Sequence, residues 1–224
     1  MIPQPSKKDA RPAASPGRPK DLAKRAAILD AAERMFLQHG FEGVSMDQIA
    51  TAAGVSKLTV YSHFGDKDAL FTEAARAWCE QQMPGSVFEP APHQPVAERL
   101  MDIARAYFAM VCAPEAVAGH RLLSSPQMVG KQLARMFWEA GPQRVQDEFA
   151  RFLERRIAAG HLEIDDVHRA AGQFFALVKG DLHPRLVFDC DDAGQAGCRE
   201  QSDAHLQAAV AVFLRAYGAR KPAP

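Results

Sequence analysis

The sequence predicts an all-α protein with an N-terminal three-helix helix-turn-helix domain and a C-terminal helical domain, about nine or ten helices in all. Apolar residues recur at helical spacing along most of the chain, and no segment alternates apolar and polar residues for long. Glycine and proline separate the periodic segments, as at Gly141-Pro142, Gly160 and Gly218. A third observation is the stretch 45–64, whose caps and turn predict two helices joined at an angle.

The composition is that of a soluble globular protein. The 224 residues are 47% apolar and 24% charged, and this length permits one or two domains with a sizeable core. No apolar run is long enough to cross a membrane, and the proline-rich N-terminus lacks the apolar segment of a signal peptide. We therefore expect a cytoplasmic protein without membrane contact. Four cysteines without CxxC spacing fit a reducing compartment: Cys79, Cys112, Cys190 and Cys198.

Residues 1–20 are expected to be a disordered basic arm, because they hold five prolines and almost no large apolar side chain. Seven Lys and Arg stand against two Asp in residues 1–25, a net charge of +5, whereas residues 26–82 carry a net charge of −4. Within the arm, Gly17-Arg18-Pro19 is the core of a motif that places an arginine in an A·T-rich minor groove. The alternative for this segment is a solvated tail.

The stretch 45–64, SMDQIATAAGVSKLTVYSHF, carries the signals of a helix, a tight turn and a second helix. Ser45 followed by Gln48 is a capping box, which predicts that the first of these helices begins there. Gly54 supplies the turn, since glycine adopts backbone angles that a β-carbon resists. Ser56 is expected to cap the second helix, which runs to the end of the stretch.

This second helix is expected to have a buried and an exposed side. Val60 and Phe64 are four residues apart and should face the core, while Leu58 and Ser62 point the opposite way. The exposed side and its flanks mix a cation, hydroxyls, an imidazole, a phenol and a leucine, which suits the major groove of DNA. An ordinary helical hairpin inside a core is the alternative. The flanking residues are Lys57, Thr59, Tyr61 and His63.

Periodic segments on either side complete an N-terminal domain over residues 21–83. One helix is expected over residues 22–39, and another should begin after Asp66, which is a good N-cap. Residues 84–95 contain four prolines and are expected to form a connection. The C-terminal domain then occupies residues 84–224.

Six further helices are expected in the C-terminal domain. Pro184 should kink or end the fifth of them, and residues 189–202 are expected to form a polar loop. The last three helices have broad apolar faces, which serve either the core of one subunit or an interface between two. The expected ranges are 96–111, 114–123, 126–140, 142–159, 166–189 and 201–217.

The N-terminal motifs together resemble the DNA-binding domain of the TetR/AcrR family of transcriptional regulators over residues 22–82. The resemblance rests on Gly40-Phe41, on the stretch 45–64, and on Lys67-Asp68-Ala69-Leu70-Phe71. It implies that the chain binds a double-stranded DNA operator. The residues expected to contact DNA are Ser45, Met46, Val55, Ser56, Lys57, Leu58, Thr59, Tyr61, Ser62, His63 and Lys67, together with Arg18, which the Gly-Arg-Pro motif of the arm indicates.

The resemblance gives these residues different roles. Leu58 and Ser62 occupy the base-reading positions, and Leu58 is bulkier than the Gly, Ala or Pro that the family often has there, which suits the methyl group of a thymine. Met46 stands where the family usually has Thr or Ser, so a hydroxyl donor to the DNA backbone is missing. The implied phosphate contacts are those of Lys57, Tyr61, His63 and Lys67.

The family's C-terminal domain binds a small-molecule effector and forms a homodimer, which implies an effector cavity among the fifth to eighth helices of this chain. A stripe of Met and aromatic residues there is equally typical of a plain core. His120, Arg121 and Arg135 would either meet an anionic ligand or face water. The residues expected to bind the effector are Tyr107, Phe108, Met136, Phe137 and Trp138.

The sequence with this resemblance predicts a homodimeric repressor that an effector releases from a near-palindromic operator. The alternative is a ligand-independent DNA-binding factor, architectural or cell-cycle, on the same scaffold. An enzyme is not expected, since Gly-rich phosphate loops, GxSxG and HExxH motifs are missing from the sequence, and no cofactor is expected. Helix caps and surface groups are favoured over a metal site at His161, Asp165, Asp166 and His168. Incidental loop thiols are favoured over a redox pair of Cys190 and Cys198.

Overall fold

The structure is a computed structural model that describes residues 22–89, 94–124, 130–190 and 194–219. These residues form eleven α-helices and one 3-10 turn, with no strand among them, and the predicted all-α fold is confirmed. None of these helices is long and apolar enough to cross a membrane. The elements are α1 (Leu22–His39), α2 (Met46–Ala52), α3 (Lys57–Phe64), α4 (Lys67–Gln82), η1 (Gly85–Phe88), α5 (Val96–Val111), α6 (Pro114–Leu123), α7 (Lys131–Ala140), α8 (Pro142–Ala158), α9 (Val167–Lys179), α10 (Leu182–Val187) and α11 (Gly194–Tyr217).

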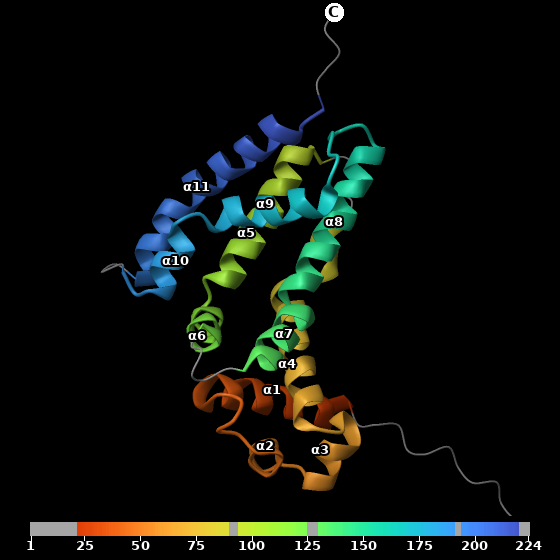
Figure 1. The fold of residues 1–224 in the computed structure, drawn as a ribbon, viewed down its shortest axis with the longest axis vertical. Coiled ribbons are helices and arrows are strands. Elements are labelled where there is room, and N and C mark those ends of the chain that lie inside the picture. Colours follow the sequence, from red (N-terminus) through yellow and green to blue (C-terminus); the bar gives the residue numbers. More distant parts are fainter. Residues whose placement is uncertain (1–21, 90–93, 125–129, 191–193, 220–224) are drawn as a thin grey trace, which may run out of the picture.

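Helices α1, α2 and α3 and the first half of α4 enclose a small core of their own, at the lower end of the molecule in Figure 1. Ile28, Ile49 and Val60 are fully buried there, one from each of the first three helices, and Leu70 of α4 joins them. Helix α4 then continues upward, and Met83 at its C-cap is buried in a second, larger core. A single helix therefore connects the two parts of the molecule.

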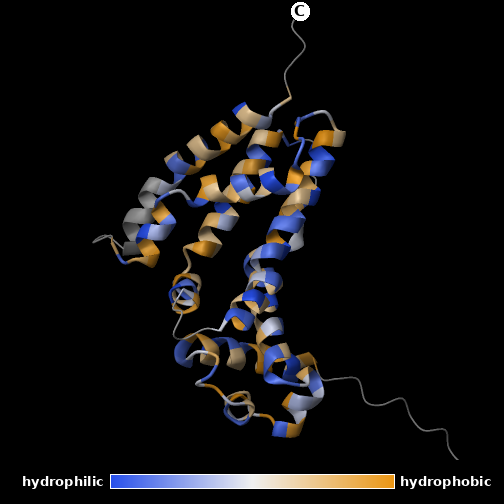
Figure 2. Ribbon diagram, viewed as in Figure 1, coloured by the Kyte–Doolittle hydropathy of each residue, from blue (hydrophilic) through white to orange (hydrophobic). Residues whose placement is uncertain are grey.

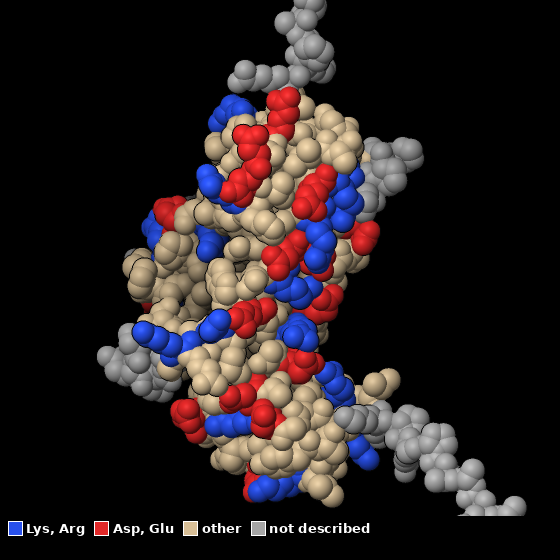
Figure 3. All heavy atoms as spheres, turned by 45° about the vertical axis from the view of Figure 1, so that its right-hand side comes forward, with Lys and Arg blue, Asp and Glu red and all other residues tan. Residues whose placement is uncertain are grey.

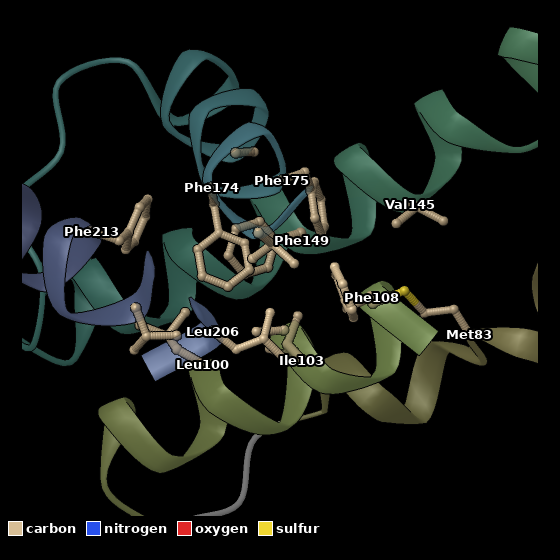
Figure 4. Packing of buried hydrophobic residues seen from close by; sticks show 14 of the residues in the cluster. Met83, Leu100, Ile103, Phe108, Val145, Phe149, Phe174, Phe175, Leu206 and Phe213 are labelled. Atoms are coloured by element: carbon tan, nitrogen blue, oxygen red, sulfur yellow. The ribbon is translucent and has the colours of Figure 1, made fainter. Parts of the chain in front are cut away.

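The larger core is built around Phe149 of α8. Its ring centroid lies 4.5 Å from that of Phe174 and 5.0 Å from that of Phe175, both on α9. Figure 4 shows these rings together, with Phe213 of α11 and aliphatic side chains of α5 around them. Hydrophobic residues recur along α5, α8, α9 and α11 between hydrophilic ones (Figure 2). Because buried aromatic side chains dominate core energetics, this cluster holds the C-terminal helices together.

The helix expected over residues 166–189 is two helices in the structure, so the described residues form eleven helices where about nine or ten were expected. Helix α9 ends at Lys179, and Gly180 follows with a left-handed φ of 50°. A β-carbon at this position would lie 2.3 Å from the ring of His205, so only glycine fits without a shift. The interruption is confirmed but its predicted cause is wrong, since Pro184 lies in the first turn of α10, where proline is tolerated.

Two other boundaries differ from the expectation. Helix α11 begins at Gly194, so the loop expected over residues 189–202 is wrong for more than half of its length. Helix α7 begins at Lys131, five residues later than expected, and residues 125–129 lie outside the part that the structure describes. The error at α11 arises because polar composition alone does not distinguish a loop from the end of a solvated helix.

Candidate functional site

Helices α2 and α3 begin at the caps that the sequence predicts. The Ser45 hydroxyl accepts a hydrogen bond from the backbone N–H of Gln48 at 3.3 Å, while the Gln48 side chain accepts one from the Ser45 backbone at 2.8 Å. Gly54 has a φ of 65° and turns the chain between the two helices. The Ser56 hydroxyl accepts a hydrogen bond from the Thr59 backbone at 3.2 Å and starts α3. These local hydrogen bonds fix the angle at which α3 leaves the core.

Helix α3 buries one side and exposes the other. Val60 and Phe64 lie in the small core, whereas Leu58 is 78% exposed and Tyr61 is 41% exposed. Ser62 is exposed on the same side. Covering a leucine that a rigid helix holds in water lowers the free energy, because its apolar surface leaves the water. The side formed by Leu58, Tyr61 and Ser62 is therefore a candidate contact surface, and we call it the recognition surface.

The recognition surface is bordered by an ion pair. The Nζ atom of Lys57 lies 2.8 Å from a carboxylate oxygen of Asp47 on α2 and 5.9 Å from the ring centroid of Tyr61. The hydrogen bond that the Lys57 ammonium group donates to Asp47 raises the pKa of Lys57 above its ordinary value. Exposed ion pairs contribute little to stability. A phosphate can therefore replace Asp47 as the partner of this ammonium group at a small cost in free energy. Figure 3 shows positive and negative side chains mixed over the visible face of the molecule.

The other residues that the resemblance assigns to DNA have different surroundings. Met46 is 6% exposed and packs in the small core. His63 is half-buried, and its Nδ1 has no hydrogen-bond partner among the described atoms. Lys67 places its ammonium group 4.2 Å from the ring centroid of Phe41, and Arg18 lies outside the described residues. The remaining positions surround the turn and the caps, namely Ser45, Val55, Ser56 and Thr59.

Sequence reasoning did not single out the contacts that fasten α1 to α4. A guanidinium nitrogen of Arg25 on α1 lies 2.5 Å from a carboxylate oxygen of Glu73 on α4, and this guanidinium is 5.3 Å from the ring centroid of Phe64. Arg76 shares the same carboxylate group at 2.8 Å. These contacts tie the end of α3, which we call the recognition helix, to α1 and α4. No spacing in the sequence indicates them, because the partners meet only through tertiary packing.

An apolar cavity of about 220 Å³ lies between the two parts of the molecule. Its wall is formed by α1 and α4 on the N-terminal side and by α5 to α9 on the C-terminal side. Phe36, Phe41 and Phe71 line it as a triad with ring centroids 5.4–5.7 Å apart. Gly172 and Ala176 of α9 line it with little or no side chain, which leaves the space open. The cavity is large enough for an aromatic molecule, since benzene fits an engineered cavity of about 150 Å³.

Of the five residues expected to bind an effector, three line the cavity and two do not. Tyr107, Phe137 and Trp138 lie on the wall of the cavity. Phe108 lines a separate hollow between α5, α6, α10 and α11, and Met136 lines neither space. Tyr107 and Phe108 are neighbours on one helix and therefore point about 100° apart. Ligand binding by these residues stays a prediction, and the aromatic triad from the N-terminal side was not anticipated.

Polar side chains are a minority on the cavity wall. Burial raises the pKa of the Cys79 thiol to about 11 and raises that of the Tyr107 phenol well above its usual range. Burial also raises the pKa of the Glu33 carboxyl group, and neighbouring carboxylates raise it further. The thiol and the phenol are therefore neutral at pH 7. The polar residues on the wall are Glu33, Cys79, Tyr107, Glu115, His120, Gln146 and Lys179.

The lesser candidates occupy ordinary positions. Asp166 accepts a hydrogen bond from the third backbone N–H of α9 at 2.9 Å and caps this helix. His161 and His168 are exposed. Cys190 is an exposed free thiol, and the side chain of Cys198 lies outside the description.

Comparison with known proteins covers both parts of the chain. Residues 28–74 match the model of bacterial regulatory proteins of the tetR family, and residues 98–219 match the model of the AefR-like transcriptional repressor C-terminal domain. The chain is 40% identical over 57 residues to the HTH-type transcriptional repressor AcnR of Corynebacterium efficiens, and this match spans 25% of the chain and 30% of AcnR. The chain thus spans less than one third of the length of this relative.

Two longer similarities extend through the C-terminal part. The HTH-type transcriptional regulatory protein RaaS of Mycobacterium tuberculosis is 30% identical over 164 residues, which cover 73% of this chain and 71% of RaaS. The solved structure of the flavonoid-responsive regulator FrrA is 35% identical with a TM-score of 0.69, and the match covers 90% of this chain and 100% of FrrA. With its capped helix-turn-helix, its exposed recognition surface and its all-helical C-terminal part, the chain belongs to the TetR family of DNA-binding transcriptional regulators.

Proposed function

We propose that this regulator is a homodimeric repressor, with domains over residues 21–83 and 84–224, that leaves its operator when a small molecule fills the cavity. The observation that carries this proposal is the shared wall of the cavity, which α1 and α4 form on one side and α5 to α9 on the other. A ligand in this place contacts both domains, so it can favour one orientation of the recognition surface over another. This location favours an effector-controlled regulator over a ligand-independent DNA-binding factor.

Reading a near-palindrome takes two copies of the chain, and α11 offers a face for the second. Among the described side chains of α11, Ala204, Ala208, Ala211 and Val212 are exposed. Small side chains allow two helices to approach closely, which supports a helical interface with the partner here. A two-fold dimer then places the recognition surfaces in successive major grooves, ideally about 34–36 Å apart.

The cavity wall supports a flat, mostly apolar effector. Phe36, Phe71 and Phe175 offer ring surfaces for stacking, and the neutral Tyr107 hydroxyl can donate a hydrogen bond. FrrA, which is 35% identical, is named a flavonoid-responsive regulator, and flavonoids are planar polyphenols. We therefore propose an aromatic polyphenol as the class of effector.

Release from DNA requires that the effector bind more tightly to the arrangement that does not fit the operator. A hundredfold loss of operator affinity corresponds to a coupling free energy of about 2.7 kcal/mol, which lies in the usual range for allostery. Linkage then requires that the operator weaken effector binding by the same factor.

Selection from random DNA followed by calorimetry tests this proposal. Selection is expected to return a near-palindrome, and the selected DNA is then used as the operator. Quercetin, a planar polyphenol, is titrated into the free protein and into the protein–operator complex. We expect the operator to lower the quercetin affinity by the factor by which quercetin lowers the operator affinity. Equal quercetin affinity in the two titrations would refute the release mechanism, although the family assignment would stand.

Filling the cavity from α9 is expected to weaken effector binding, and with it release, without loss of operator binding. In Gly172→Met the new side chain enters the cavity wall, where a β-carbon meets no atom within 4 Å. Loss of a helix-interior glycine also stabilises α9 by about 1 kcal/mol, so the variant should fold. We expect quercetin affinity to fall about tenfold or more, equivalent to ~1.4 kcal/mol. Fluorescence anisotropy of labelled operator, with and without quercetin, measures both effects.

The matched control is Ala118→Met, which adds the same side chain at an exposed position of α6 that does not line the cavity. This control should bind the operator and respond to quercetin like the wild type. Normal release of Gly172→Met would contradict the cavity as the effector site.

A further inference from the structure

The ring of Phe41 lines the cavity and also lies close to a cation. It follows α1, just after Gly40, and lines the cavity together with Phe36 and Phe71. Its ring centroid lies 5.7 Å from that of Phe36 and 5.4 Å from that of Phe71. The ammonium group of Lys67 lies 4.2 Å from the centroid of this ring, within the range of a cation–π interaction.

Lys67 is the first residue of α4 and follows the recognition helix by only two residues, Gly65 and Asp66. It is half-buried, and no carboxylate forms an ion pair with it within the described part of the chain. Lys57 differs in this respect, since Asp47 holds its ammonium group at 2.8 Å. Within the described part of the chain, the face of the Phe41 ring thus restrains the Lys67 ammonium group.

We propose that Phe41 is the positioning residue that holds Lys67 toward the phosphate backbone of the operator. A lysine side chain has four rotatable bonds and samples many rotamers in water, so a surface that restrains it raises the fraction of time in which it meets a phosphate. The ring suits this purpose because it carries no charge, so a phosphate can approach the ammonium group without displacing a competing carboxylate. The proposal rests on the assignment of Lys67 to DNA and needs no effector.

A double-mutant cycle on the full chain tests the proposal with operator DNA selected as above. Phe41→Leu keeps an apolar side chain in the cavity wall but removes the ring, and Lys67→Met removes the cation. We expect Phe41→Leu to lower operator affinity about 5- to 30-fold and to reduce the slope of log affinity against log salt. In the Lys67→Met background, Phe41→Leu should cause no further loss, because the cation on which the ring acts is gone.

Two variants separate positioning from structure. Phe36→Leu removes a ring of the same triad, whereas the cation–π contact of Lys67 is with Phe41, so its effect on operator affinity should be the same with and without Lys67. Phe41→Tyr keeps the ring face and should retain the salt slope of the wild type. Equal losses from Phe41→Leu in both lysine backgrounds would overturn the proposal, as would a wild-type salt slope for Phe41→Leu. Because the cycle contains no quercetin, its result is independent of whether effector release occurs.

Discussion

Leu58→Glu is expected to weaken operator binding by about 2–6 kcal/mol of binding free energy per dimer, which is about 1–3 kcal/mol in each half-site. In the complex that we propose, the substitution removes an apolar contact with base edges and brings a carboxylate toward the phosphates at both recognition surfaces. The fold should survive, because Leu58 is 78% exposed and glutamate is as good a helix former as leucine. A negative charge in the first turn of α3 is also compatible with the helix dipole.

Anisotropy with labelled operator measures this loss, and circular dichroism checks the helix content. Gln38→Glu is the matched control, because it adds the same charge at an exposed position of α1 in the same domain. We expect this control to bind within about threefold of the wild type, since distant exposed charges are screened. A Leu58→Glu variant that binds as tightly as Gln38→Glu would show that α3 does not enter the groove with this side.

Phe149→Ala is expected to lower the free energy of unfolding by about 3–5 kcal/mol. The Phe149 ring is fully buried, with the rings of Phe152, Phe174 and Phe175 within 5.8 Å of it, centroid to centroid. Its removal leaves a void that rigid neighbouring rings cannot fill. Urea unfolding followed by circular dichroism, at one protein concentration for all variants, measures the change.

Phe188→Ala provides the comparison, because Phe188 is 76% exposed. Its cost should stay within about 0.5 kcal/mol, as for most surface substitutions. If the two variants lost the same stability, the aromatic cluster would not be the centre of the fold. Anisotropy of labelled operator with Phe149→Ala would show whether operator binding survives a weakened C-terminal core, since the small core of α1 to α4 does not include Phe149.

The helix-turn-helix was predictable because its signals are local. The capping box of Ser45 and Gln48, the turn at Gly54 and the cap at Ser56 each depend on residues a few positions apart, and all three form as predicted. The outward direction of Leu58 follows from helical periodicity alone. Such features need no knowledge of which helices pack together.

The cavity was only partly predictable because it is a property of packing. The sequence pattern places Tyr107 and Phe108 alike on a helix with many apolar residues. Only the position of α4 and α9 decides which of the two lines the cavity. The break at Gly180 has a similar origin. Its sequence signal is a single glycine, and the reason that no β-carbon fits is the ring of His205, which is 25 residues away in the chain.

The charge distribution of the N-terminal part has a consequence for how the regulator finds its target in a genome. Residues 26–82 carry a net charge of −4, and Lys57 on the recognition helix is paired with Asp47. Non-specific affinity for DNA comes almost entirely from released counterions, so a folded domain with few free cations is held weakly at random sequences. Occupancy of an operator depends on the ratio of specific to non-specific affinity across all competing sites. The folded domain therefore contributes little to retention at random sequences, and residues 1–25, with their net charge of +5, are left as the main source of non-specific attraction to the chromosome.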